Sequence, residues 1–294
     1  MLRMARWAAA FVVGGIVLTG VAGAAPAVSA NLAGPTGLGP MIPAPSNPGI
    51  PGITGTTNGT VQPVQLSTNW SGYAVTSTPG SPTSAFTSVQ GTFDQPSIVC
   101  NGKAGRFVAD WVGLDGFKDQ TVEQDGTFAT CSGPGHMTPS YVAWYEMYPA
   151  ASMNVFKVNA GDEIKPAVSF ANGVFSLSIS DVTSGQTKSI SAACKSCRRT
   201  SAEWIIERPE LCNKTGTCFL SPLPNFGLAT LSSDKAATEA GGPAPMSSYS
   251  PIPMDMVQPK GTTVELLDQT NPLNGAGNAF TVTWERSGKK LPLS

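Results

Sequence analysis

Three short segments of the chain place carboxyl groups among aromatic residues at the spacing of β-strands. They are residues 111–116 (Trp-Val-Gly-Leu-Asp-Gly), 143–149 (Ala-Trp-Tyr-Glu-Met-Tyr-Pro) and 202–207 (Ala-Glu-Trp-Ile-Ile-Glu). Because side chains alternate along a strand, Glu203 and Glu207 share one face. Such a face can line a cleft in which a carboxyl group acts as a general acid or base. The alternative is a solvated outer face on which the glutamates have no catalytic role.

The sequence offers few residues for other kinds of catalysis. His136 is the single histidine, and its Ser-Gly-Pro-Gly-His setting is typical of a surface turn rather than of a catalytic triad. The Gly-x-Ser-x-Gly elbow of serine hydrolases and the Asp-Thr-Gly motif of aspartic proteases do not occur in the sequence. One histidine also excludes a histidine-rich metal site. We expect the protein to use neither a metal nor an organic cofactor.

Residues 1–30 have the organisation of a secretory signal peptide. Arg3 and Arg6 give a basic start, residues 7–20 are an apolar run, and small residues lead to Ala30, where cleavage fits best. The run is shorter than the roughly 20 residues that a membrane-spanning helix needs. We therefore expect a secreted protein that keeps no attachment to a membrane after cleavage.

The chain carries six cysteines, and an even number in an exported protein is typical of disulfide bonds. The alternative is zinc, because Cys194 and Cys197 have the spacing of zinc ligands. Cys212 and Cys218 are spaced too widely to supply the second half of such a site. We expect disulfides, with Cys212–Cys218 as one pair, and the pairing of the remaining four cysteines stays open.

Charge and composition exclude several classes of protein. The 18 Lys and Arg residues nearly balance the 19 Asp and Glu residues, so the chain lacks the basic excess that nucleic-acid binding requires. Charged residues make up only 13% of the chain, which argues against a long helical or coiled-coil protein. Residues 31–66 are rich in Pro, Gly, Ser and Thr. They are too poor in large apolar residues to form a core, so we expect a flexible leader or a short pro-segment there.

Residues 67–294 carry the pattern of one all-β domain. Apolar and polar residues alternate at 175–180 (Phe-Ser-Leu-Ser-Ile-Ser) and at 280–285 (Phe-Thr-Val-Thr-Trp-Glu). Many short strands separated by Gly, Pro, Asn and Asp are typical of a sandwich or a barrel. Residues 232–260, which are rich in Ala, Gly, Pro and Ser, are expected to form a long connection.

The three segments occur in a fixed order together with two further features. Residues 69–73 (Asn-Trp-Ser-Gly-Tyr) precede them, and Gln124 follows Asp115 by nine positions. These five features resemble the glutamic peptidases, also called eqolisins, a family of acid endopeptidases. The resemblance runs from about Ser67 through Cys218. It implies an all-β fold, a concanavalin-like or jelly-roll sandwich of two bent antiparallel sheets with the active site on a concave face.

The resemblance also implies roles for individual residues. The family's catalytic pair, a glutamine and a glutamate, matches Gln124 and Glu207, with Glu203 as the second choice for the glutamate. Residues that line the family's substrate cleft match Trp111, Asp115, Glu146 and Tyr148.

Three residues depart from the family pattern. Asp125 follows Gln124 at a position where we expect an uncharged residue. Arg208 and Pro209 follow Glu207, where better-known fungal members have an acidic and an aromatic residue. A substrate pocket beside the catalytic glutamate is therefore expected to differ from that of those members.

A glutamine and a glutamate can together hydrolyse a peptide bond in acid. Glu207 can take the proton of a water molecule and return it to the leaving nitrogen. The amide of Gln124 can accept a hydrogen bond from that water and donate one to the developing oxyanion. An amide does not titrate, whereas histidine would be charged throughout the acid range. We therefore expect an enzyme that acts on polypeptides at acid pH. We also expect it to be a monomer.

Two other functions fit parts of the same pattern. A glycoside hydrolase would use a carboxyl pair such as Glu146 and Glu207, held about 5–5.5 Å or about 6.5–9.5 Å apart. A catalytically inactive relative would bind carbohydrate or peptide on the aromatic residues. The presence of both Gln124 and Glu207 favours the peptidase.

Overall fold

The computed structural model describes residues 54–57, 60–77, 84–117, 119–212 and 217–292, with side chains from residue 64 onward. All of them belong to one unit of the chain, Leu32–Ser294. The expected signal peptide at 1–30 and the first part of the expected leader lie outside the described residues.

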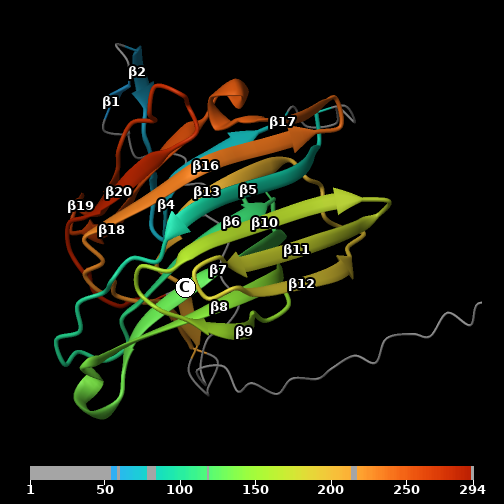
Figure 1. The fold of residues 1–294 in the computed structure, drawn as a ribbon. Helices are drawn as coiled ribbons and strands as arrows, with labels where there is room; N and C mark the ends of the chain where they lie inside the picture. The colour runs from blue at the N-terminus through green and yellow to red at the C-terminus, as the bar shows by residue number, and fades with distance from the viewer. Residues whose placement is uncertain (1–53, 58–59, 78–83, 118, 213–216, 293–294) are drawn as a thin grey trace, which may run out of the picture. The chain divides into compact units, whose positions relative to one another are not determined.

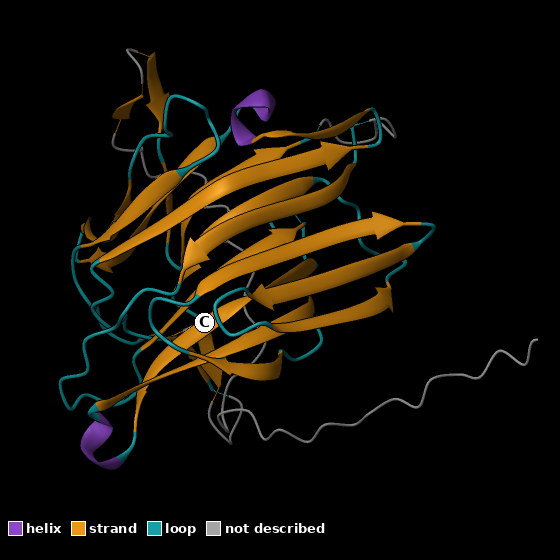
Figure 2. Ribbon diagram, viewed as in Figure 1, coloured by secondary structure: helices purple, strands orange, loops and turns teal. Residues whose placement is uncertain are grey.

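The described chain is built almost entirely from strands, with short helical turns at η1 and η2 (Figure 2). The elements are β1 Thr54–Thr57, β2 Thr60–Pro63, β3 Gln65–Ser67, β4 Trp70–Thr76, β5 Phe86–Asp94, β6 Phe107–Leu114, β7 Val122–Ser132, η1 Pro134–His136, β8 Thr138–Tyr148, β9 Met153–Val158, β10 Glu163–Ala171, β11 Val174–Asp181, β12 Gln186–Ala193, β13 Ser201–Glu207, β14 Glu210–Cys212, β15 Cys218–Leu220, β16 Leu228–Thr238, β17 Gly241–Pro245, η2 Met246–Tyr249, β18 Ile252–Lys260, β19 Thr263–Thr270, β20 Phe280–Trp284 and β21 Leu291–Pro292.

One antiparallel ladder runs through two packed layers. Its order is β12-β11-β10-β5-β16-β20-β19-β18-β4-β13-β6-β7-β8-β9. Strands β5, β10 and β11 pack against β6 and β7, and β16, β20, β19 and β18 join the two layers (Figure 1). The expected all-β sandwich of two bent antiparallel sheets is thus confirmed.

The inward faces of the two layers form the main core. On β11, Phe175, Leu177 and Ile179 are buried, whereas the serines between them are only partly covered. They share one apolar cluster with Trp204 and Ile206 of β13 in the opposite layer. The alternation read from the sequence therefore identifies the face of the strand that enters the core.

A second apolar cluster lies on the other face of the layer that contains β4, β13, β6, β7 and β8. The rings of Trp70 and Trp111 meet edge to face there, with centroids 4.9 Å apart and planes at 78°. Ile205 belongs to this cluster, although its neighbours Trp204 and Ile206 face the main core. The full set is Trp70, Ala74, Ala109, Trp111, Phe117, Val122, Phe128, Trp144, Ile205 and Met254. By alternation, Glu207 lies on this same face.

Strand β13 joins parts of the chain that are far apart in sequence. It pairs with β4 on one side and with β6 on the other. Glu207, its last residue, is opposite Trp70 of β4 and Ala109 of β6.

Two segments expected to be irregular form strands. Residues 232–260 contain most of β16 together with β17, η2 and β18. Ala236 and Ala237 are buried because β16 pairs with β5. The small residues that predicted a connecting loop therefore lie in a tightly packed sheet. Within the expected leader, β1 pairs with β2, and β3 pairs in parallel with β18. Val64 and Leu66 are buried, so the sheet begins before residue 67.

The six cysteines form three disulfide bonds. These are Cys100–Cys131, Cys194–Cys197 and Cys212–Cys218. The expected Cys212–Cys218 pair is confirmed. The zinc alternative is wrong, because Cys194 and Cys197 use their sulfur atoms to bond each other.

Candidate active site

Four neighbouring strands carry expected site residues on one face. In the order β13, β6, β7 and β8, they contribute Glu207, Trp111, Gln124 and Glu146. All four side chains are 1% exposed or less. Their polar atoms must therefore be satisfied inside the protein or by a bound substrate.

Glu207 is held by neutral hydrogen-bond donors. Trp111 donates its indole N–H to Oε2 of Glu207, with 2.9 Å between nitrogen and oxygen. The side-chain nitrogen of Asn69 lies 3.4 Å from Oε1. No ion pair to Glu207 occurs among the described side chains. The surroundings therefore orient the carboxyl group without neutralising its charge.

Burial raises the pKa of Glu207 well above its ordinary value. The hydrogen bond from Trp111 opposes the rise because it stabilises the charged form, while nearby Glu146 adds to it. At acid pH the carboxyl group of Glu207 is therefore protonated, and it can give a proton as well as take one.

Gln124 is directly opposite Glu146 in the register of β7 and β8. Its Nε2 donates to Oε2 of Glu146 across 2.6 Å. Its Oε1 is buried and has no hydrogen-bond partner within the described part of the chain. The amide thus has one end fixed and an acceptor oxygen that is free for a ligand.

Glu203 lies in the same cross-strand row as Gln124, with Gly113 between them. Its carboxyl group has different electrostatic neighbours from that of Glu207. Burial raises the pKa of Glu203 well above its ordinary value, and Asp115, Asp119 and Glu123 add to the rise. The register thus places Glu203 in the row of Gln124, whereas Glu207 is hydrogen-bonded to Trp111 and has its pKa raised by Glu146.

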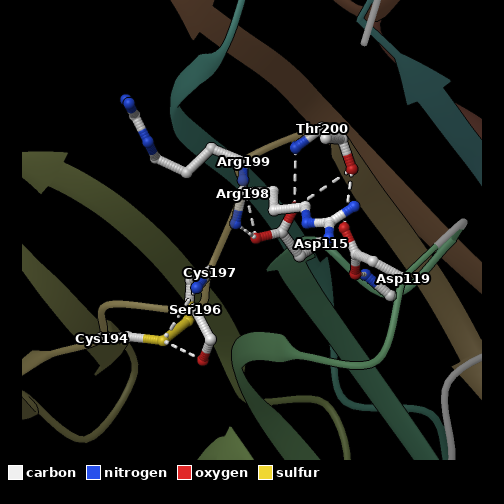
Figure 3. The surroundings of a disulfide bond; sticks show 9 residues. Asp115, Asp119, Cys194, Ser196, Cys197, Arg198, Arg199 and Thr200 are labelled. Atoms are coloured by element: carbon white, nitrogen blue, oxygen red, sulfur yellow. Dashed lines mark hydrogen bonds between the residues drawn. A yellow bond between two sulfur atoms is a disulfide. The ribbon is translucent and has the colours of Figure 1, made fainter. Parts of the chain in front are cut away.

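Asp115 holds the chain that leads into β13 (Figure 3). Its carboxylate accepts hydrogen bonds from the backbone N–H groups of Arg198, Arg199 and Thr200 at 2.7–2.8 Å. This segment directly follows the Cys194–Cys197 disulfide. Burial raises the pKa of Asp115 to about 6, with Asp119 adding to the rise. Asp115, which was expected to line the substrate cleft, therefore uses its carboxylate to bind backbone N–H groups.

Trp111 and Tyr148 take different places around the second apolar cluster. Trp111 lies inside it, against Trp70. Tyr148 is partly buried and packs against its edge. Burial raises the pKa of Tyr148, and Glu210 and Glu146 add to the effect. Tyr148 is thus the expected cleft residue with the greatest access to solvent.

Asn69 is a site residue that the sequence does not predict, although residues 69–73 contribute to the resemblance. Its side chain reaches Glu207, and Ser67 fixes its position. The hydroxyl of Ser67 donates to Oδ1 of Asn69 at 3.2 Å and accepts the backbone N–H of Trp70 at 3.1 Å. An Asn-Trp pair that begins a strand was the only signal in the sequence.

Asp125 and Arg208, two of the three residues that depart from the family pattern, face away from the site. Burial raises the pKa of Asp125 well above its ordinary value, and backbone hydrogen bonds from Ala167 and Ser178 of the opposite layer oppose the rise. Arg208 donates from Nη2 to the carbonyl oxygens of Leu220, at 3.3 Å, and Lys289, at 2.7 Å. Both side chains connect the site layer to other parts of the fold.

His136 lies in η1 and is exposed, as expected of a turn residue. It takes no part in the group formed by Trp111, Gln124, Glu146 and Glu207. The described side chains of this group provide acids, an amide and an indole, which can transfer protons and stabilise an oxyanion.

The fold and these side chains define a β-sandwich with a buried site lined by carboxyl groups and an amide. The model of the Peptidase A4 family matches residues 68–273. The chain therefore belongs to that family, the glutamic peptidases.

Individual relatives agree with this assignment. Scytalidopepsin B of Scytalidium lignicola is 31% identical over 183 residues, which are 60% of this chain and 65% of that protein. The crystal structure of scytalido-glutamic peptidase with a peptide-based transition state analog superimposes with a TM-score of 0.60 at 23% identity. It covers 74% of this chain and 98% of that one. The crystal structure of aspergilloglutamic peptidase from Aspergillus niger superimposes with a TM-score of 0.50 at 26% identity. The match covers 61% of this chain and 99% of that one.

Proposed function

We propose that this protein is a secreted acid endopeptidase that hydrolyses peptide bonds by direct attack of water, with Gln124 and Glu207 as the catalytic pair. One observation carries the proposal. Glu207 is a fully buried carboxyl group that is oriented by Trp111, and it shares a sheet face with a Gln124 amide whose oxygen is free. The family assignment supports the same reaction.

The raised pKa of Glu207 favours a cycle that begins with the protonated acid. As water adds to the scissile carbonyl carbon, Glu207 gives its proton to the carbonyl oxygen, and its carboxylate then takes a proton from the added water. The same proton passes to the leaving nitrogen, and the C–N bond breaks. The new carboxyl group returns the last proton to Glu207. Acid–base assistance of this kind is worth about 10²–10⁴-fold in rate.

Gln124 serves the same cycle without changing its charge. Its carbonyl oxygen accepts a hydrogen bond from the attacking water, and an N–H group donates to the oxygen of the tetrahedral intermediate. A donor of this type is worth roughly 10²–10³-fold in rate. The glycosidase alternative is disfavoured because Glu146 is hydrogen-bonded to Gln124 and because the family is one of peptidases.

The disulfide bonds support an extracellular location. Three disulfide bonds are typical of a protein that matures in an oxidising compartment. Within the described ranges, no helix has the length and apolar character needed to cross a membrane. We expect the mature protein to be a monomer that acts on polypeptides.

The proposal is tested by incubating the purified protein with a denatured protein at acid pH and mapping the cuts by mass spectrometry. Cleavage inside the substrate chain that is lost in Glu207→Gln, but kept in Glu163→Gln, is the expected result. Glu163 is a matched control because it lies on β10 in the other layer and pairs with Lys165. Cleavage that survives in Glu207→Gln contradicts the proposed pair.

A further inference from the structure

Glu146 has a contact that a residue lining a substrate cleft would not need. Its carboxyl group is completely buried and lies directly opposite Gln124 on the neighbouring strand. The 2.6 Å between Nε2 of Gln124 and Oε2 of Glu146 is shorter than the usual N–H···O distance.

This contact has a consequence for the direction of the Gln124 amide. An amide can rotate by half a turn and exchange its donor end for its acceptor end, with little change in shape. Oε2 of Glu146 accepts this hydrogen bond, which selects the orientation in which the nitrogen of Gln124 faces Glu146. The oxygen then points away from Glu146, and it is the amide atom left without a partner among the described residues.

The orientation matters because the two ends of the amide do different work in the proposed reaction. In one orientation the oxygen is free to accept from water and a second N–H remains for the oxyanion. In the other orientation, the carbonyl oxygen of Gln124 would face Oε2 of Glu146, and the hydrogen bond from Nε2 would be lost. Nothing in the shape of Gln124 itself decides between the two.

We propose that Glu146 is a positioning residue that holds the Gln124 amide in its productive orientation. The proposal rests on the proposed function and adds to it a third residue, which acts through Gln124 rather than on the substrate. Glu146 also lies close enough to Glu207 to raise its pKa. It is thus hydrogen-bonded to one member of the proposed catalytic pair and acts electrostatically on the other.

The kinetic test compares Glu146→Leu, which removes the acceptor, with Glu146→Gln, whose own amide oxygen can accept the same hydrogen bond. On a short peptide at acid pH, we expect Glu146→Leu to lower kcat by about 10²-fold with a smaller change in KM. We expect Glu146→Gln to recover most of the loss. A change confined to KM would overturn the proposal and assign Glu146 to substrate binding. Equal losses in both variants would overturn it too, because the carboxyl group itself would then be required.

A double-mutant cycle separates action through Gln124 from independent action. In the Gln124→Ala background, Glu146→Leu should cause no further loss of kcat, because the group that it positions is gone. Additive losses would contradict the proposal. If Glu146→Leu does not fold, as judged by circular dichroism, Glu146→Ala takes its place in the same cycle. Glu163→Gln serves again as the control.

A spectroscopic measurement makes the outcome independent of catalysis. With ¹⁵N-labelled glutamine, the side-chain NH₂ signals of Gln124 are assigned by their loss in Gln124→Ala. We expect one of the two protons to be shifted and slow to exchange in the wild type, and to lose both properties in Glu146→Leu. Unchanged signals would overturn the positioning role. The absence of any peptide cleavage by the wild type, with these signals as expected, would count against the proposed function alone.

Discussion

The indole N–H of Trp111 points at the carboxyl group of Glu207 and lies 2.9 Å from Oε2. The donor comes from β6 and the acceptor from β13, and both side chains are inaccessible to solvent. A neutral donor in an apolar cluster stabilises the carboxylate less than a cation would. Glu207 therefore keeps a raised pKa while its carboxyl group is held in one orientation.

Trp111→Phe should raise the pKa of Glu207 further, because it removes a hydrogen bond to the charged form. Hydrogen bonds to charged groups contribute about 1.5–3 kcal/mol, so kcat should fall by roughly 10–100-fold. The alkaline limb of the pH profile of kcat/KM should move to higher pH. A profile with an unmoved alkaline limb would show that Trp111 acts only through packing.

Glu207→Gln should abolish proteolysis and leave the fold intact. Glu203→Gln should retain substantial turnover, because Glu203 has a different set of acidic neighbours, Asp115, Asp119 and Glu123. Both variants are compared with wild type by peptide assay and circular dichroism. Near-normal activity in Glu207→Gln, together with loss in Glu203→Gln, would assign the catalytic role to Glu203, which lies four residues earlier on the same face of β13.

Gln124→Ala should lose roughly 10²–10³-fold in kcat with a smaller change in KM, because an oxyanion donor acts chiefly in the transition state. Steady-state kinetics on a peptide measures the two constants separately. If KM alone changes, Gln124 positions substrate and takes no part in the chemistry.

Asp115→Ala should act on stability more than on substrate binding. It leaves the buried N–H groups of Arg198, Arg199 and Thr200 without their acceptor, at a cost on the order of 1–3 kcal/mol for each buried donor. Thermal unfolding at acid pH should show a large fall in Tm. A normal Tm with a raised KM would show instead that Asp115 contributes to substrate binding.

The folded protein should be most stable in acid and lose stability as the pH rises. Burial raises the pKa of Asp110 to about 7 and that of Glu123 to about 10, and neighbouring Asp115 adds to the rise at Glu123. Below about pH 4 such groups are protonated in both the folded and the unfolded chain. Above it, the unfolded chain releases protons that the folded protein keeps, so the free energy of unfolding falls through pH 7. Urea unfolding at pH 3, 5 and 7 measures this trend.

Asp125→Asn provides a matched check on the pH trend. The variant removes a buried ionisable group from between the layers, so it should narrow the gap in stability between pH 3 and pH 7. The measurement is the same urea series, with Glu163→Gln as the control. A wild-type protein that is more stable at pH 7 than at pH 3 would contradict the account of the buried acids.

The sequence predicts those parts of this fold that depend on local alternation. The pattern at 175–180 identifies the buried face of β11, and the pattern at 202–207 places Glu207 opposite the main core. The sequence does not predict β16 to β18. Their small residues are typical of a connecting loop, and they indicate a strand only when the neighbouring strand is known. Ala236 and Ala237 are informative only once β5 is placed next to them.

The roles of single site residues depend on contacts between distant segments. Nothing near Asp115 in the sequence indicates that its carboxylate meets the backbone of residues 198–200. The hydrogen bond between Gln124 and Glu146 depends on the register of β7 and β8, which one-dimensional spacing does not fix. The resemblance to a family located these residues, and the fold gave two of them different partners from those expected.

The pairing of Glu207 with Trp70 has a consequence for the order in which the protein matures. These residues belong to β13 and β4, so the chain must close a loop of well over a hundred residues before they meet. Contacts of such long range form late in folding, because the entropy of loop closure is lost before they contribute. A ribosome-bound or partly folded chain therefore has no assembled site. Under the proposed function, the chain can cleave peptide bonds only when folding is complete. The proteins of the cell that makes the enzyme are therefore protected from cleavage while the chain is still unfolded.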